Sequence, residues 1–187
     1  AYAHNPTTLP SHANILTGMT PPFHGVSENS KSKLPDACLT IAEYLKAAGY
    51  ATAAFIGAFP LDSRFGLDQG FDIYDDSFPS LPARMGTSAE RRAGEVVKAA
   101  SAWISGREGK WFCWVHLFDP HAPYAPPEPF LSRYKADPYS GEAAYVDYEL
   151  GLLFGELRKS GLLERTFIVL TADHGESLGE HGEMTHS

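Results

Sequence analysis

The chain has 187 residues, of which 43% are hydrophobic and 20% charged, the composition of an ordinary globular domain. The 15 Lys and Arg residues against 23 Asp and Glu residues give a net charge of −8, which argues against a nucleic-acid or anionic-membrane binder. The length suits one domain with a sizeable core, and no apolar run reaches the roughly 20 residues that span a bilayer. Two cysteines, Cys38 and Cys113, are too few for a disulfide scaffold and leave the redox compartment open.

Both ends of the chain indicate a segment of a longer protein. The first residues carry no initiator Met and no basic or apolar leader. The last residues stop at Ser187, inside a run dense in polar groups where a natural domain rarely ends. We therefore expect further chain on both sides, and any signal or membrane anchor would lie there.

Apolar spacing divides the chain into alternating helices and strands. Stretches with apolar side chains at helical spacing, or with a helix-start signal such as Ser11 as N-cap, are predicted helices: residues 11–16, 39–48, 88–105 and 143–160. Short unbroken apolar runs are predicted buried strands: residues 50–56, 111–118 and 166–171. Residues 57–82 are predicted to form a long surface loop, and the prolines of 120–129 exclude a helix. The alternation predicts a layered α/β fold with a mainly parallel sheet, whose ligands bind at the carboxyl ends of the strands.

Asp173 and His174 directly follow the last predicted strand. A carboxylate and an imidazole at such a strand end can together hold a divalent ion such as zinc or manganese. His181 and His186 follow closely and favour a site, although their spacing does not match the His-Glu-x-x-His zinc motif. In the alternative interpretation, Asp173 caps the next turn and His174 is its partner.

The same stretch resembles the nucleophile elbow of serine hydrolases. Residues 175–179 read Gly-Glu-Ser-Leu-Gly and follow a predicted strand, as an elbow does. An elbow also needs a helix after its serine, and Gly179 and Gly182 interrupt any helix here. The Asp and His partners would have to follow Ser177, and few residues remain. The serine-hydrolase interpretation is therefore disfavoured.

Two further polar groups lie at a strand end and at a helix start. His121 follows the second predicted strand on a proline-held turn, which suits contact with a substrate anion or a leaving group. Alternatively its imidazole only hydrogen-bonds a neighbouring loop, and His116 inside the strand is left unassigned. Thr8 precedes the first predicted helix, where N–H groups and the helix dipole favour an anion. Its hydroxyl is a candidate nucleophile if a metal lowers its pKa, whereas the residues alone favour N-capping.

Together these stretches resemble the sulfatase family of the alkaline phosphatase superfamily. The family motif runs Cys or Ser, any residue, Pro, Ser, Arg, then Leu-Thr-Gly and His-Gly-Val. Residues 8–12 read Thr-Leu-Pro-Ser-His, followed by Leu-Thr-Gly at 16–18 and His-Gly-Val at 24–26. The resemblance continues in order through later motifs and covers nearly the whole chain: residues 41–45, 49–50, 70–72, 119–121, 171–176 and 179–182.

The resemblance implies an α/β/α sandwich with a divalent ion (zinc, manganese or calcium) beside a nucleophile at a helix start. It places Thr8 at the nucleophile position, in contact with the metal. Asp173 and His174 match metal ligands, and His121 matches a substrate contact. His12 stands where the family has Arg, and His186 falls near the position of a substrate-binding Lys. We count both as catalytic candidates.

The resemblance also implies missing parts. The family's metal shell is completed by aspartates of an earlier first strand, and its C-terminal strands follow later. Residues 1–187 are therefore expected to be a single, incomplete catalytic domain that binds metal weakly and is inactive alone. The uncovered sheet is expected to promote self-association. Family members often work outside the cytoplasm, so a periplasmic, extracellular or membrane-anchored location is expected.

Departures from the family pattern bear on the chemistry. Sulfatases convert Cys or Ser into formylglycine, whose aldehyde hydrate attacks sulfur, whereas Thr8 would give a ketone. His12 replaces the Arg that supports the hydrate, and residues 57–60 lack the Lys and His of the family's substrate-binding motif. His174 stands where calcium-dependent sulfatases commonly have Asn. A Thr nucleophile with Asp and His ligands resembles instead the phosphodiesterases, nucleotide pyrophosphatases and phosphoglycerol transferases of the superfamily.

The sequence therefore predicts a metal-dependent hydrolase that acts through Thr8 on phosphate or sulfate esters, with phosphate esters favoured. Its substrates would be small-molecule, glycan or lipid esters. Two alternatives remain, a true sulfatase and a non-catalytic sulfatase-like module.

Overall fold

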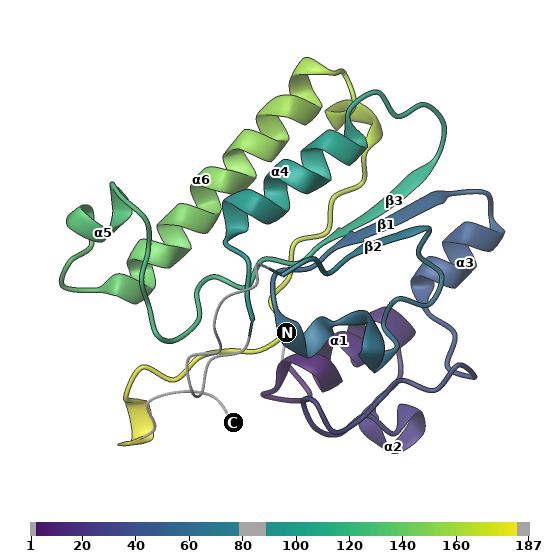
Figure 1. Cartoon of the computed structure of the whole chain (residues 1–187), viewed down its shortest axis with the longest axis horizontal. Helices are drawn as coiled ribbons and strands as arrows, with labels where there is room; N and C mark the ends of the chain where they lie inside the picture. Colours follow the sequence, from purple (N-terminus) through teal and green to yellow (C-terminus); the bar gives the residue numbers. More distant parts are fainter. Residues whose placement is uncertain (1–2, 79–88, 183–187) are drawn as a thin grey trace.

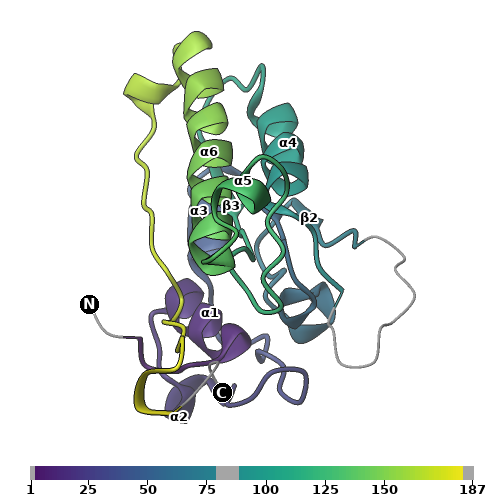
Figure 2. The same cartoon turned by 90° about the vertical axis from the view of Figure 1, so that its left-hand side faces the viewer.

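The structure, a computed structural model, describes residues 3–78 and 89–182. Its centre is a three-stranded parallel sheet in the order β2-β1-β3, with these bounds: β1 Ala51–Phe55, β2 Ile73–Asp75 and β3 Trp111–Val115. Two long helices lie side by side against one face, α4 (Ala93–Ile104) and α6 (Pro138–Lys159) (Figures 1 and 2). The opposite face carries α1 (Thr8–Thr17) and α3 (Ile41–Ala47).

The central strand β1 sends alternate side chains into two cores. Ala54 and Ile56 pack with apolar residues of α1, whereas Ala53 and Phe55 pack with Val96 and other residues of α4. This alternation follows from the period of two along a strand. A strand with both faces covered reads as a continuous apolar run, which is why residues 50–56 could be recognised in the sequence. The predicted layered α/β fold with a parallel sheet is confirmed.

The longest helix, α6, begins five residues before the predicted start at 143. Pro138 occupies its first turn, where a missing N–H costs nothing, and the Asp137 carboxylate caps it by accepting the Ser140 N–H at 3.1 Å. Farther along, Leu153 and Leu157 pack against α4. The early turns escaped the periodicity analysis because their buried residues include a glycine and a glutamate.

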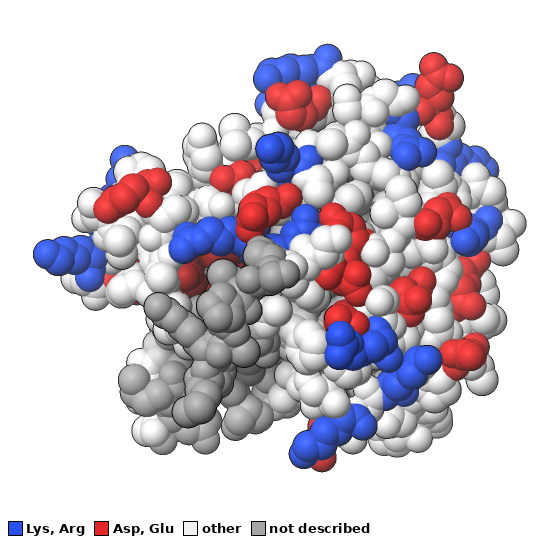
Figure 3. All heavy atoms as spheres, viewed as in Figure 1, with Lys and Arg blue, Asp and Glu red and all other residues white. Residues whose placement is uncertain are grey.

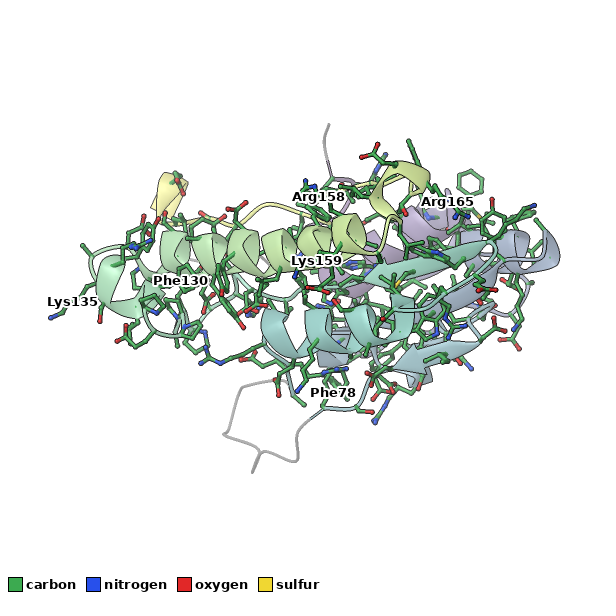
Figure 4. All side chains as sticks on the ribbon, turned by 90° about the horizontal axis from the view of Figure 1, so that it is seen from above. Phe78, Phe130, Lys135, Arg158, Lys159 and Arg165 are labelled. Carbon is green, nitrogen blue, oxygen red and sulfur yellow. The ribbon has the colours of Figure 1, made fainter. Side chains whose placement is uncertain are left out.

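Short elements occupy the connections. The predicted loop 57–82 contains β2, which the apolar pattern did not reveal because the strand has three residues and is only partly buried. The remaining helices are α2 Pro21–His24, α5 Phe130–Arg133 and short 3-10 turns at Phe59–Leu61, Ser63–Phe65, Leu163–Arg165 and Glu180–Gly182. Figure 4 shows Phe130 of α5 beside α6, where its ring lies 5.7 Å from that of Tyr145, and Lys135 pointing outward at the end of the molecule.

The first helix starts at Thr8, so the prediction of Ser11 as its N-cap is wrong. The N-cap is Thr7, and Pro10 lies within the first turn. Proline is tolerated there because the first N–H groups of a helix have no intrahelical partner. Ser11 and His12 consequently lie inside the helix and are buried.

The third predicted strand, residues 166–171, is not part of the sheet. No described strand pairs with it, and Phe167, Val169 and Leu170 are 92%, 72% and 74% exposed. Figures 1 and 2 show the segment as a separate, irregular stretch of chain that runs from the end of α6 toward α1. An unbroken apolar run is typical of a strand that other elements cover on both faces. Among the described residues, no strand or helix covers this run.

The surface carries charges of both signs. On the face shown in Figure 3, acidic and basic side chains are interspersed rather than separated into large patches. Among the described residues, no helix has the length and apolar character needed to cross a membrane.

Both cysteines are free, which answers the question of pairing that the sequence left open. Cys38 is buried and Cys113 lies half-buried on β3. Burial raises the pKa of the Cys113 thiol to about 12, so this thiol stays protonated and unreactive at neutral pH.

Candidate active site

The first turns of α1 meet the turn that follows the exposed segment 166–171. The Ser11 hydroxyl donates to the Asp173 carbonyl at 2.5 Å, and Nδ1 of His12 lies 3.5 Å from Oδ2 of Asp173. These residues are more than 160 positions apart in the sequence. The fold therefore brings the helix start that carries Thr8 next to the predicted metal ligands.

Thr8 is the first residue of α1 and is 3% exposed. The capping role that the residues alone favoured is not its role, because the N-cap is Thr7. The next N–H of the helix, that of Leu9, donates to Oδ1 of Asn29 at 2.8 Å, from a segment later in the sequence. Thr8 thus stands at a helix N-terminus, where the positive end of the dipole favours an anion, without serving as the cap.

His12 links the helix start to the acidic turn. Its Nδ1 lies 2.8 Å from the Thr8 carbonyl oxygen as well as 3.5 Å from the Asp173 carboxylate. Both neighbours are acceptors, so we assign the proton to Nδ1. Burial lowers the pKa of His12 below its usual value, although Asp173 acts in the opposite direction. His12 is therefore a neutral donor, unlike the permanently charged Arg.

Asp173 and His174, the two predicted metal ligands, contact each other through their side chains. Oδ2 of Asp173 lies 3.3 Å from Nε2 of His174, and two ligands of a tetrahedral zinc are about 3.4 Å apart. Nδ1 of His174 lies 2.9 Å from the Gly175 carbonyl oxygen, so we assign a proton to Nδ1. In the described part of the chain, no group of three or more His, Cys, Asp or Glu side chains is arranged to hold an ion. The pair therefore fits part of a coordination shell.

His116 was left unassigned from the sequence, and the structure places it beside His12. It follows β3 and is 7% exposed, and its ring meets the ring of His12 edge-on with centroids 4.8 Å apart. The Gly57 N–H donates to its Nδ1 at 3.3 Å, so this nitrogen is unprotonated. Its place directly after a strand was the available signal, but its contact with α1 depends on the fold.

We expect the stability of the protein to fall with pH below about 6.5, partly because of His116. Burial, with smaller effects of His12 and His174, lowers the pKa of His116 well below its usual value. Between the two pKa values the unfolded chain binds a proton that the folded chain does not. This group therefore destabilises the protein as pH falls, by at most about 1.4 kcal/mol per pH unit.

Chemical denaturation at pH 7.5, 6.5 and 5.5 measures this dependence. His116→Gln should flatten it, because the titrating group is removed. His4→Gln is the matched control, since His4 is exposed. An unchanged pH dependence in His116→Gln would contradict the assignment.

His121 lies on the proline-rich stretch after β3. Its ring stacks on Phe118 with centroids 4.0 Å apart, Phe118 lies 6.3 Å from His116, and His116 contacts His12. This run of rings connects His121 to the helix start that holds Thr8. Nδ1 of His121 lies 2.7 Å from the carbonyl of Ala122, so one ring nitrogen does bond its own loop.

The remaining sequence candidates contribute less. His186 lies outside the described residues. Ser177 is followed only by the 3-10 turn Glu180–Gly182, and its hydroxyl donates to the Glu180 carbonyl at 3.3 Å. The helix that a nucleophile elbow requires is not found in the described residues after Ser177, which end at Gly182.

The fold is a parallel sheet between helices, and the start of α1 lies against the turn that carries Asp173 and His174. The sequence model of the family named Sulfatase matches residues 1–187, and the chain belongs to the sulfatase family.

Three comparisons illustrate the likeness. The chain is 26% identical over 217 residues to an ulvan-active sulfatase of Formosa agariphila, covering 93% of this chain and 42% of that protein. It resembles the phosphonate monoester hydrolase of Agrobacterium radiobacter with a TM-score of 0.79 at 17% identity, covering 100% and 56% of the two chains. It resembles a protein crystallised with its substrate D-glucosamine-2-N,6-O-disulfate with a TM-score of 0.75 at 19% identity, covering 100% and 59%. The chain thus spans about half the length of these relatives.

Proposed function

We propose that the protein is a metal-dependent hydrolase that cleaves phosphate esters through the hydroxyl of Thr8. The observation that carries the proposal is the contact between the first turns of α1 and Asp173, made through Ser11 and His12. The contact supports the proposal because it brings the first turns of α1, which begin at Thr8, against the turn that carries Asp173 and His174. The side chains described fit a nucleophile and part of a metal shell at one place.

The metal-binding role rests on the donor set. Asp173 and His174 would hold a divalent ion together with Thr8, and further carboxylates, which the family resemblance places upstream, would complete the shell. A carboxylate and an imidazole accept zinc and manganese, and calcium also occurs in the family. When bound, such an ion neutralises developing charge and lowers the pKa of a hydroxyl.

The residues of the chain would carry two successive transfers. The Thr8 hydroxyl would lose its proton to solvent as Oγ forms a bond to phosphorus and the bond from phosphorus to the ester oxygen breaks, and the departing alcohol would take up a proton, for which His121 is the proposed donor. Water would then attack the phosphothreonine, give one proton back to His121 and keep the other on the released phosphate, while the Thr8 oxygen leaves and regains its proton from solvent. His186 is proposed to contact the non-bridging oxygens, and neutral His12 to hold the Asp173 carboxylate in place.

The proposed preference for phosphate esters over sulfate esters follows from the chemistry of the Thr8 Oγ atom. A Thr hydroxyl can attack phosphorus and leave again when water attacks the phosphoester. It cannot form the aldehyde hydrate by which sulfatases expel sulfate. The fold accommodates both chemistries, since sulfatases and phosphonate monoester hydrolases share it.

A true sulfatase is the second candidate, favoured by the names of relatives such as the ulvan-active sulfatase. Parallel assays of the full-length protein with nitrophenyl phosphate, bis-nitrophenyl phosphate and nitrophenyl sulfate separate the two. We expect kcat/KM for a phosphate ester to exceed that for the sulfate ester at least about tenfold, or about 1.4 kcal/mol. Faster turnover of the sulfate ester would contradict the proposal.

Two parts of the proposal concern the whole protein. A small-molecule, glycan or lipid ester is the proposed substrate, and a periplasmic, extracellular or membrane-anchored location is proposed from the family resemblance. A non-catalytic module would show neither turnover nor stoichiometric metal binding, so a metal titration of the full-length protein distinguishes it.

A further inference from the structure

Glu142 is a buried carboxylate on α6. It lies in the second turn of α6 and is 5% exposed. No salt bridge is recorded for it among the described residues; its two oxygens accept backbone N–H groups instead. Oε2 accepts the N–H of His121 at 3.0 Å, and Oε1 accepts the N–H of Ala125 at 2.7 Å. Burying a carboxylate is costly unless its oxygens are hydrogen-bonded, and these two backbone N–H groups meet that need.

The segment that Glu142 binds has few other means of holding its shape. Residues 119–127 form no helix or strand, and the prolines in that stretch have no N–H to donate. The N–H groups of His121 and Ala125, one on each side of Pro123, both donate to the Glu142 carboxylate, so this side chain joins the two halves of the loop. Charge-assisted hydrogen bonds of this kind are roughly twice as strong as neutral ones.

Two further contacts hold the loop that Glu142 binds. A Cβ at Gly141 would lie 2.9 Å from Pro126, so α6 packs directly on the loop. At the other end, Oδ2 of Asp119 accepts the N–H of Ala93 at the start of α4, at 2.8 Å. The loop thus contacts both α4 and α6, and His121 lies between these contacts.

We propose that Glu142 is a positioning residue that holds His121 in its working orientation through the backbone of residues 121–125. The inference rests on the proposed function, in which His121 serves the reaction. The carboxylate touches no reacting atom. It fixes the loop on which the imidazole stacks against Phe118, and displacing such a group by about 1 Å can cost up to a hundredfold in rate.

A double-mutant cycle in the full-length protein tests this role. Glu142→Gln keeps the shape but leaves one acceptor oxygen for two N–H groups, and His121→Ala removes the positioned ring. Glu142→Gln alone should lower kcat about tenfold with little change in KM, because orientation rather than binding is lost. In the His121→Ala background the same change should cost less than about twofold, because the residue through which it acts is gone.

Two further measurements separate positioning from folding. Hydrogen exchange of the amides of His121 and Ala125 should quicken in Glu142→Gln while thermal unfolding stays cooperative. Glu156→Gln is the matched control, because Glu156 lies on the same helix and pairs only with Lys159 at the surface among the described residues. If Glu142→Gln does not fold, Glu142→Asp, which keeps the charge on a shorter stem, takes its place in the cycle.

The outcomes are distinct. If His121→Ala leaves kcat unchanged, the proposed role of His121 fails and the inference with it. If His121→Ala lowers kcat but Glu142→Gln does not, only the inference fails. An equal loss from Glu142→Gln in both backgrounds shows a general structural role and also overturns it.

Discussion

Replacing Thr8 by alanine is expected to lower the rate of phosphate-ester hydrolysis at least about a hundredfold, because the covalent route is lost. Thr8→Ser should keep much of the activity, since only a methyl group is removed. The fold should survive, because Thr8 is not the helix cap and alanine is a good helix former. Steady-state kinetics on the full-length protein with the better nitrophenyl ester measure the loss.

Thr7→Ala is the matched control for this experiment. Thr7 is the same residue type one position earlier, and its side chain forms no capping hydrogen bond in the described structure. Intact mass spectrometry should find Thr8 unmodified at rest and carrying one phosphate in trapped turnover. Full phosphodiesterase activity in Thr8→Ala would show that another group is the nucleophile.

Removing either Asp173 or His174 should abolish metal retention while the fold remains cooperative. The two donor atoms lie 3.3 Å apart, as ligands of one ion do, and both side chains lie on a turn rather than in the core. Loss of one metal ligand should weaken metal affinity at least about a hundredfold. Replacing a residue that only hydrogen-bonds a ligand already costs up to about that much. The hydrogen bond from Ser11 should persist, because it goes to the main-chain carbonyl of Asp173.

Metal content after dialysis, together with denaturant unfolding of Asp173→Ala and His174→Ala, provides the test. Asp147→Ala and His4→Ala are controls, since both side chains are exposed and lie on other elements. Variants that unfold readily but keep their metal would favour the alternative in which Asp173 only caps its turn.

The order of helices and strands could be predicted from the sequence because it depends on local apolar periodicity. Strand β1 is covered on both faces and reads as an unbroken apolar run, and α4 shows its buried face every three to four residues. The prolines after Asp119 exclude a helix whatever surrounds them. Thr8, His121, Asp173 and His174 could be singled out because reactive side chains at strand ends and helix starts stand out from the apolar pattern.

What lies against each element was decided only by the tertiary structure. The side chain of Asn29, from another segment, accepts the N–H of Leu9 in the first turn of α1, and His12 is buried one turn farther along. Residues 166–171 are as apolar as a buried strand, yet they are exposed because no described strand pairs with them.

The contacts of His116 and Glu142 were also decided by the tertiary structure. His116 meets His12, which is 104 positions away in the sequence, and Glu142 binds the N–H of His121, which is 21 positions away. The sequence by itself determined the α/β class, two of the three strands and the candidate side chains of the site. The packing of α1 and α6 at the ends of the strands decided which of those side chains meet. The distance between residues far apart in the chain depends on the order and register of the strands, which local periodicity does not determine.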